Sequence, residues 1–102
     1  MSADGPGGEA AGAACERVLE IVNEKGLHAR ASARLVEVVE RFDARATVRR
    51  DGQETGGDSI MGLLMLAASC GSEVEVETEG PEAEALMEAV AALLADKFGE
   101  GG

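Results

Sequence analysis

The stretch SEVEVETE, residues 72–79, alternates between polar and apolar or β-branched side chains without a break. Successive side chains of a β-strand point to opposite faces, so Val74, Val76 and Thr78 would share one face and four glutamates would share the other. A strand with one apolar and one charged face is typical of a sheet that is covered on one side only. The stretch therefore predicts a sheet with one face on a core and one face in water.

Two further segments predict the remaining strands. Residues 17–23, RVLEIVN, are short, rich in β-branched side chains and bounded by polar ones, which is typical of a strand. Residues 44–57 contain Asp51-Gly52, a favoured two-residue turn, between a longer and a shorter apolar segment. The first segment therefore predicts a single strand and the second a hairpin.

Three segments predict helices, because apolar residues recur at three- and four-residue intervals. The first follows Gly26, and its apolar positions are Ala31, Leu35, Val38, Val39 and Phe42. The second is brief, covers residues 59–69 and has Ser59 as a natural N-cap. The last begins after Pro81 and ends near Gly99.

The element order β-α-β-β-α-β-α, in a chain of 102 residues, predicts one α+β domain. We expect a two-layer sandwich in which three helices cover one face of a four-stranded, mostly antiparallel sheet. Residues 17–98 would form this domain. Residues 1–16 are rich in Gly and Ala and are expected to form a disordered extension, and residues 99–102 a flexible tail.

The composition narrows the classes of function. The formal net charge is −11 and the chain has no Trp or Tyr, which argues against nucleic acid as a partner. No run approaches the roughly 20 apolar residues of a membrane span. One histidine and two scattered cysteines, Cys15 and Cys70, provide neither a metal-ligand set nor a disulfide framework. We expect a cytoplasmic protein, monomeric, that uses no metal or other cofactor.

The segment GLHARASARLV, residues 26–36, places the only histidine, His28, where a helix begins. The first turn of a helix offers N–H groups that have no intrahelical partner, and such groups bind anions. Gly26 permits an unusual backbone conformation just before them. The partial positive charge at the start of the helix also disfavours the imidazolium form of His28, and it keeps the ring neutral and nucleophilic. These features favour a phosphoryl group on His28 over a histidine that is merely exposed.

The surrounding charges favour a carrier of the group. Eight of the nine basic residues lie in the first half of the chain, and Lys25, Arg30 and Arg34 cluster around the histidine. Arg30 could donate charge-assisted hydrogen bonds to a phosphoryl group. The segment offers no paired carboxylate and no second histidine to activate water. We therefore expect reversible phosphoryl transfer by a protein that is not a free-standing catalyst.

Two motifs carry a family resemblance. GLHAR at residues 26–30, followed by SIMGLLML at 59–66, resembles the HPr family of histidine-containing phosphocarrier proteins of the bacterial phosphoenolpyruvate-dependent phosphotransferase system. The resemblance covers about residues 17–98 and implies an open-faced β-sandwich of four antiparallel strands and three helices.

The resemblance also implies roles for single residues. His28 would be phosphorylated on Nδ1 by Enzyme I and would pass the group to an EIIA-type acceptor, with Arg30 assisting. Family members commonly have proline where this chain has Ala31. Proline at a helix start removes one unpartnered N–H and fixes φ, so we expect altered kinetics and retained function.

Ser59 has two interpretations that are compatible. As an N-cap it would accept a hydrogen bond from the helix that follows. The resemblance implies, in addition, a regulatory phosphorylation site modified by HPr kinase/phosphorylase. A phosphate at this position would repel acidic partners.

The short helix after Ser59 is apolar nearly all round, because Met61, Met65 and Leu66 add to the core-facing positions. An apolar exposed helix marks a contact surface, and the matching helix of the family docks partners. The predicted docking patch consists of Ala29, Ala33, Ile60, Met61, Leu64 and Met65. Arg34 is a further candidate, for steering acidic partners. The alternative is that the patch residues are mostly core.

Three functions remain open. The first is a phosphocarrier in a sugar-transport or a regulatory relay. The second is a regulatory interaction protein controlled by phosphorylation of Ser59. The third is a ferredoxin-like α+β domain without phosphoryl chemistry, in which His28 would be replaceable.

Overall fold

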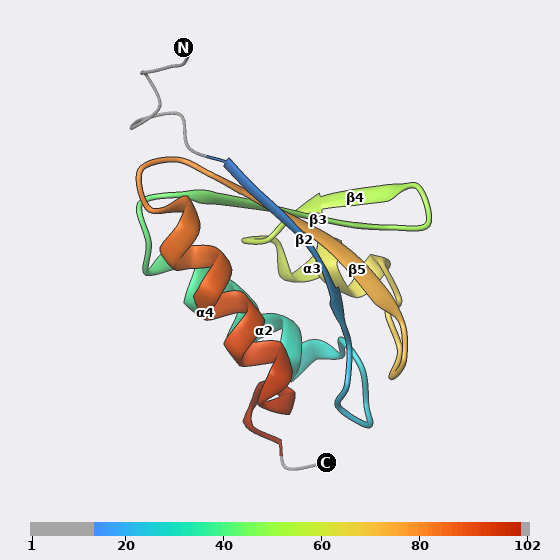
Figure 1. Cartoon of the computed structure of the whole chain (residues 1–102). Coiled ribbons are helices and arrows are strands. Elements are labelled where there is room, and N and C mark those ends of the chain that lie inside the picture. The colour runs from blue at the N-terminus through green and yellow to red at the C-terminus, as the bar shows by residue number, and fades with distance from the viewer. Residues whose placement is uncertain (1–13, 101–102) are drawn as a thin grey trace.

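The computed structural model describes residues 14–100, and these residues form one α+β unit in the predicted order β-α-β-β-α-β-α (Figure 1). The elements are β2 (Ala14–Glu20), α2 (Ala29–Glu40), β3 (Arg45–Arg50), β4 (Gln53–Gly56), α3 (Ile60–Met65), β5 (Glu73–Glu79), α4 (Ala83–Ala95) and a 3-10 turn, η1 (Lys97–Gly99).

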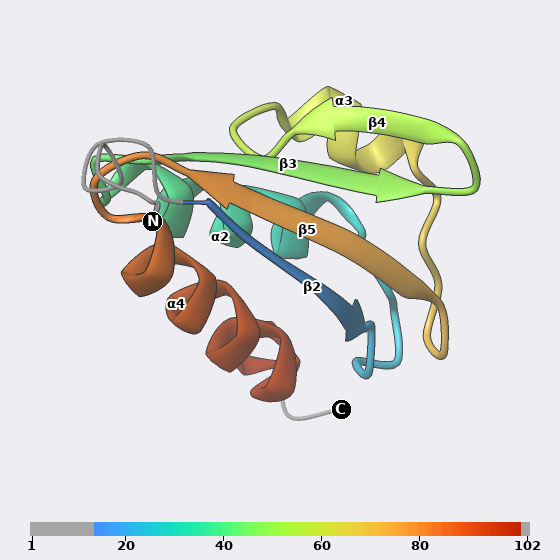
Figure 2. The same ribbon diagram turned by 45° about the horizontal axis from the view of Figure 1, so that its top comes forward.

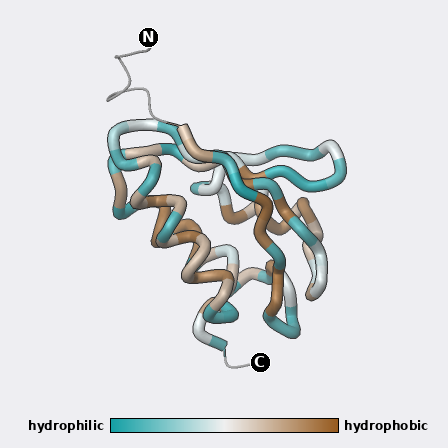
Figure 3. The backbone as a smooth tube through the Cα atoms, in the orientation of Figure 1, coloured by the Kyte–Doolittle hydropathy of each residue, from teal (hydrophilic) through white to brown (hydrophobic). Residues whose placement is uncertain are grey.

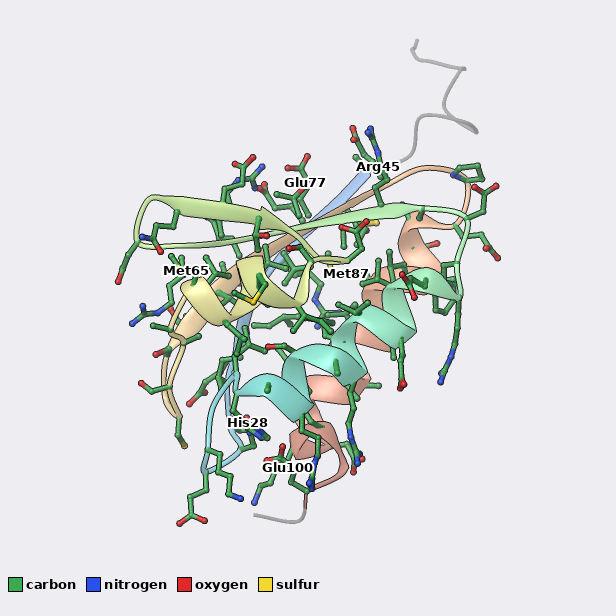
Figure 4. All side chains as sticks on the ribbon, turned by 180° about the vertical axis from the view of Figure 1, so that it is seen from behind. His28, Arg45, Met65, Glu77, Met87 and Glu100 are labelled. Atoms are coloured by element: carbon green, nitrogen blue, oxygen red, sulfur yellow. The ribbon has the colours of Figure 1, made fainter. Side chains whose placement is uncertain are left out.

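The sheet has the strand order β2-β5-β3-β4, and every neighbouring pair is antiparallel (Figure 2). Val76 on β5 lies opposite Arg17 on β2 and opposite Val48 on β3. Seen from behind, all three helices lie in front of one face of the sheet (Figure 4). The predicted fold class, an open-faced sheet with three helices on one side, is confirmed.

Strand β5 has the alternation that its sequence predicts. Val74, Val76 and Thr78 are buried under the helices, and the glutamates point to the open face. The hydroxyl of the buried Thr78 donates a hydrogen bond of 2.7 Å to the carbonyl of Ala83, so it enters the core with a partner. The predicted turn between β3 and β4 is also confirmed: Asp51 and Gly52 have φ of 51° and 79°, as a type I′ turn requires.

The core lies between the sheet and the two long helices. Its fully buried large side chains include Ile21, Leu63, Leu86, Val90 and Phe98. Figure 3 shows that α4 is largely hydrophobic and that the β3–β4 hairpin is mostly hydrophilic. Strand β3 nevertheless contributes the buried Ala46 and Val48 to the core, and β4 forms the more exposed edge of the sheet.

The structure differs from the prediction at both ends of the domain. Strand β2 begins at Ala14, three residues before the predicted start at Arg17, and residues 14–16 pair with residues 77–79. At the other end, Gly99 and Glu100 were expected to begin a tail, yet their N–H groups donate to the carbonyls of Asp96 and Lys97. The rest of the predicted extension and tail, residues 1–13 and 101–102, lies outside the described residues.

Candidate functional site

The turn before His28 depends on Gly26. This residue has φ of 69°, and a Cβ at this position would lie 2.6 Å from the carbonyl oxygen of Ala68. The N–H of Leu27 donates to that same carbonyl at 2.8 Å. Glycine is therefore needed both for the left-handed backbone and for the close approach of the segment after α3. The contact joins the start of α2 to the end of α3.

His28 is the N-cap of α2. Its backbone is extended, with φ of −82° and ψ of −175°, and its carbonyl accepts the first helical hydrogen bond, from the N–H of Ser32 at 2.8 Å. The ring turns back over the helix start, and Nδ1 accepts a long hydrogen bond of 3.3 Å from the N–H of Arg30. The imidazole therefore lies at the amino end of the helix, as expected.

The other ring nitrogen contacts the carboxyl-terminal segment. Nε2 of His28 lies 2.5 Å from Oε2 of Glu100, and the two side chains are 29% and 14% exposed (Figure 4). Nδ1 faces an N–H donor and Nε2 faces a carboxylate acceptor. In the neutral ring only the tautomer with its proton on Nε2 satisfies both neighbours. This tautomer leaves the lone pair on Nδ1.

Asn23 holds the carboxylate of Glu100 from the other side. Its side-chain amide donates to Oε1 of Glu100 at 3.0 Å and to the carbonyl of Gly26 at 2.8 Å. The hydrogen bond from Asn23, followed by that from His28, lowers the pKa of Glu100 below its ordinary value and outweighs the effect of desolvation. Glu100 is therefore an anion at neutral pH, and its carboxylate is placed to accept a hydrogen bond from an N–H at Nε2.

The segment after α4 positions Glu100 through an unusual backbone. Lys97, Phe98 and Gly99 have φ of 56°, 55° and 76°, and a left-handed conformation costs a non-glycine residue about 1–2 kcal/mol. The ring of Phe98 is fully buried, and its carbonyl accepts a hydrogen bond of 2.7 Å from Nη1 of Arg34. These contacts hold the strained backbone in place. Arg34, predicted to steer partners, is therefore also a tie between α2 and the carboxyl-terminal segment.

An open cavity of about 530 Å³ lies beside the ring. Its charged lining consists of three cations and two carboxylates: Lys25, Arg30, Arg34, Glu24 and Glu100. The side chain of Arg30 is exposed, and within residues 14–100 it makes no ion pair or side-chain hydrogen bond. The chain as a whole has a formal charge of −11, which repels anions. This cavity differs, because its three cations and the amino end of α2 would attract an anion.

Helix α3 presents the predicted apolar surface. Met61 and Met65 are 69% and 70% exposed, Ile60 is also exposed and Leu64 is half-buried. Leu66, expected to add to this surface, is buried instead, because α3 ends at Met65 and the C-cap turns inward. On α2, Ala29 is exposed and Ala33 is half-buried.

The N-cap of α3 is Ser59, as predicted. Its hydroxyl accepts a hydrogen bond of 3.0 Å from the N–H of Gly62. The side chain is half-buried and precedes the exposed Ile60. A phosphoryl group on this hydroxyl stays a prediction.

The described residues contain neither a metal-ligand cluster nor a membrane-spanning helix. Between residues 14 and 100, no three His, Cys, Asp or Glu side chains gather in a group that could hold a metal ion. No helix in that range has the length and apolar character needed to span a bilayer. Cys15 and Cys70 are free thiols.

Comparison with protein families identifies the fold and the histidine segment together. The family model described as "PTS HPr component phosphorylation site" matches residues 15–96. The chain belongs to the HPr family. This HPr-family assignment covers β2 through α4 and includes both His28 and Ser59.

Individual HPr relatives match this chain over almost their whole length. The phosphocarrier protein HPr of Cupriavidus necator is 45% identical over 86 residues, which are 84% of this chain and 97% of that protein. The phosphocarrier protein NPr of Escherichia coli strain K12 is 40% identical over 86 residues, covering 83% of this chain and 96% of that one. A crystal structure of HPr from Thermoanaerobacter tengcongensis superposes with a TM-score of 0.81 at 36% identity, over 84% of this chain and 97% of that one.

The sequence predicted His28 at the start of a helix, and it missed two residues that the structure brings to the site, Asn23 and Glu100. Both are polar residues of common type in short connecting segments. The contact of Glu100 with the ring spans 72 residues of sequence, and its contact with Asn23 spans 77. Phe98, one of two aromatic residues in the chain, offered a signal, because a buried ring fixes the residues that follow it.

Proposed function

We propose that this HPr-family protein carries a phosphoryl group on Nδ1 of His28. The observation that supports the assignment is the pair of hydrogen bonds on the ring, with Nε2 against Glu100 and Nδ1 toward the N–H of Arg30. A nucleophile needs a lone pair, and this arrangement leaves it on Nδ1, at the amino end of α2.

Phosphoryl transfer to His28 needs no added base, because Nδ1 carries no proton that has to be removed. The lone pair of Nδ1 attacks phosphorus, an N–P bond forms, and the bond from phosphorus to the donor atom breaks with its electron pair returning to the donor. The ring becomes an imidazolium whose proton stays on Nε2 and faces the carboxylate of Glu100. Nδ1 then accepts no hydrogen bond, so the N–H of Arg30 is available to a phosphoryl oxygen. The guanidinium of Arg30 would bind a second oxygen.

The same geometry suits a carrier. Glu100 uses one oxygen for Asn23 and the other for His28, so it is not placed to activate a water molecule. We propose phospho-Enzyme I as the donor and an EIIA-type protein as the acceptor, as the HPr resemblance implies. The apolar surface of Ile60, Met61, Leu64 and Met65, with Ala29 and Ala33, would dock both partners.

The test is labelling by phosphoenolpyruvate in the presence of Enzyme I. The protein should acquire a phosphate that is labile in acid and stable in alkali, as a phosphoramidate is. His28→Ala should acquire none, while Ser59→Ala serves as the matched control and should be labelled like the parent. Labelling of His28→Ala at the parental level would exclude the proposed acceptor.

Regulation at Ser59 is a separate proposal, supported by the partial exposure of this residue next to the exposed Ile60. A phosphate there adds about −1.5 to −2 charges at the edge of the docking patch and would weaken binding of acidic partners. HPr kinase/phosphorylase with ATP should label the parent and not Ser59→Ala. Undiminished labelling of that variant would place the modified residue elsewhere.

A further inference from the structure

We propose that Asn23 is a positioning residue for phosphoryl transfer, acting on His28 through Glu100. The inference rests on the proposed function of His28 and adds to it a residue that never touches the ring. Asn23 is completely buried, although it belongs to the turn between β2 and α2.

The orientation of the Asn23 amide follows from its neighbours. Its NH2 group faces two acceptors, the carbonyl of Gly26 at 2.8 Å and Oε1 of Glu100 at 3.0 Å. The reversed amide would set its oxygen against both of them. The amide oxygen is buried and has no hydrogen-bond partner in the described chain, which is unfavourable. The two donated bonds therefore determine how the side chain lies.

These two bonds connect the turn, the chain end and the ring. Through Gly26, Asn23 fixes the segment that leads into His28, and through Glu100 it fixes the carboxylate that faces Nε2. A carboxylate held at both oxygens keeps its position when the ring gains a phosphoryl group and a positive charge. The other charged groups facing this cavity are Glu24 and Lys25 from the turn and Arg30 and Arg34 from α2.

The direct measurement is the tautomer of the unphosphorylated ring. The ¹⁵N chemical shifts of Nδ1 and Nε2 distinguish a protonated from an unprotonated ring nitrogen, and the chain has one histidine to observe. At a pH where the ring is neutral, the parent should carry its proton on Nε2. Asn23→Ala should shift this ratio toward that of a solvent-exposed imidazole and slow phosphorylation about three- to tenfold, the effect of losing one hydrogen bond.

A second variant separates positioning from a general loosening of the turn. In Glu100→Gln, Asn23 would orient the new amide with its oxygen toward Asn23 and its NH2 toward Nε2, which disfavours a proton on Nε2. Removing Asn23 in that background lets the amide turn over. Asn23→Ala should therefore decrease the Nε2–H fraction in the parent and increase it in Glu100→Gln.

The sign of the second effect decides the proposal. If Asn23→Ala changes the tautomer ratio in the same direction in both backgrounds, or in neither, Asn23 does not act through Glu100. If the Asn23 variants do not fold, Glu100→Gln tests the proposal by itself. A tautomer ratio in that variant equal to that of the parent would show that Glu100 does not orient the ring, and the proposed action of Asn23 through Glu100 would be wrong. The tautomer is measured on the unphosphorylated protein. If the tautomer ratios change as expected but His28 is not labelled, the carrier function alone is contradicted.

Discussion

Two arginines in different regions of the molecule are held in opposite ways. On the open face of the sheet, Arg49 donates to Glu77 at 2.6 Å and to Glu54 at 3.0 Å. Its Nη1 also lies 3.5 Å from Oε2 of Glu16. The hydrogen bonds to Glu77 and, to a smaller extent, to Glu54 raise the pKa of Arg49 above its ordinary value. Beside His28, by contrast, the guanidinium of Arg30 is exposed and makes no such pair within residues 14–100.

The difference separates an arginine that is paired with carboxylates from one whose guanidinium has no such partner within residues 14–100. Figure 4 shows Arg45 and Glu77 pointing away from the helices, and Arg45 pairs with Glu79 at 2.8 Å in the same manner as Arg49. Cations on the open face are thus matched by carboxylates across the strands. In the cavity beside His28, by contrast, Arg30 has no carboxylate partner among the described residues, so its guanidinium would be available to an anion there.

The largest effect should come from Arg30. Arg30→Ala should slow phosphoryl transfer to His28 by roughly 10- to 100-fold, because a hydrogen bond to a charged group contributes about 1.5–3 kcal/mol. The melting temperature should stay close to that of the parent, since the side chain is exposed. Rapid-quench labelling from phospho-Enzyme I and a thermal melt measure the two quantities.

Arg49→Ala is the matched control for that comparison. It should lower the melting temperature, because three carboxylates lose their common partner, and it should leave the transfer rate unchanged. If both variants slow transfer equally, the distinction between paired and available arginines has no functional meaning.

A smaller effect on the KM for phospho-Enzyme I should distinguish Met65 on α3 from Val18 on the open face of the sheet. Met65→Lys should raise the KM for phospho-Enzyme I about tenfold, since burying a methionine side chain contributes about 1.5–3 kcal/mol. Val18→Lys makes the same kind of change at a side chain that is 56% exposed on the open face of the sheet. It should leave KM unchanged, and a similar rise in both variants would argue against docking through α3.

The smallest effect should be a pH dependence of stability at the site. The pKa of Glu100 is lower in the folded protein than its ordinary value of 4.5, so the unfolded chain binds the proton more tightly. The carboxylate therefore stabilises the fold above pH 4.5, and this contribution is lost as the pH falls through the lowered folded value. The free energy of unfolding of the parent minus that of Glu100→Gln, measured by urea at several pH values, should decrease on acidification. A difference that is constant with pH would contradict the prediction.

The fold could be predicted because its signals are local. The alternation in β5, the Asp51-Gly52 turn and the N-cap at Ser59 each depend on residues that lie within a few positions of one another. His28 at a helix start is a signal of the same kind. Each such pattern constrains the backbone before any tertiary contact forms.

The site could be predicted only in part, because its support is not local. Glu100 lies in a glycine-rich segment whose composition predicts a tail. It is brought to the ring by the burial of Phe98 and by hydrogen bonds from the distant Arg34 and Asn23. The early start of β2 has the same origin, since residues 14–16 are defined by pairing with residues 77–79. The sequence pattern within either segment cannot predict these contacts, because their partners lie far away in the chain.

The location of Glu100 also bears on how the protein should be handled in the laboratory. A bulky group introduced at Gly99 or Glu100 would lie next to the imidazole that the Glu100 carboxylate contacts. Ala14, by contrast, lies at the end of β2 that is remote from the histidine turn. A fluorophore attached at Ala14 is therefore the better choice for kinetic work, because its bulk would be separated from His28 by the length of β2.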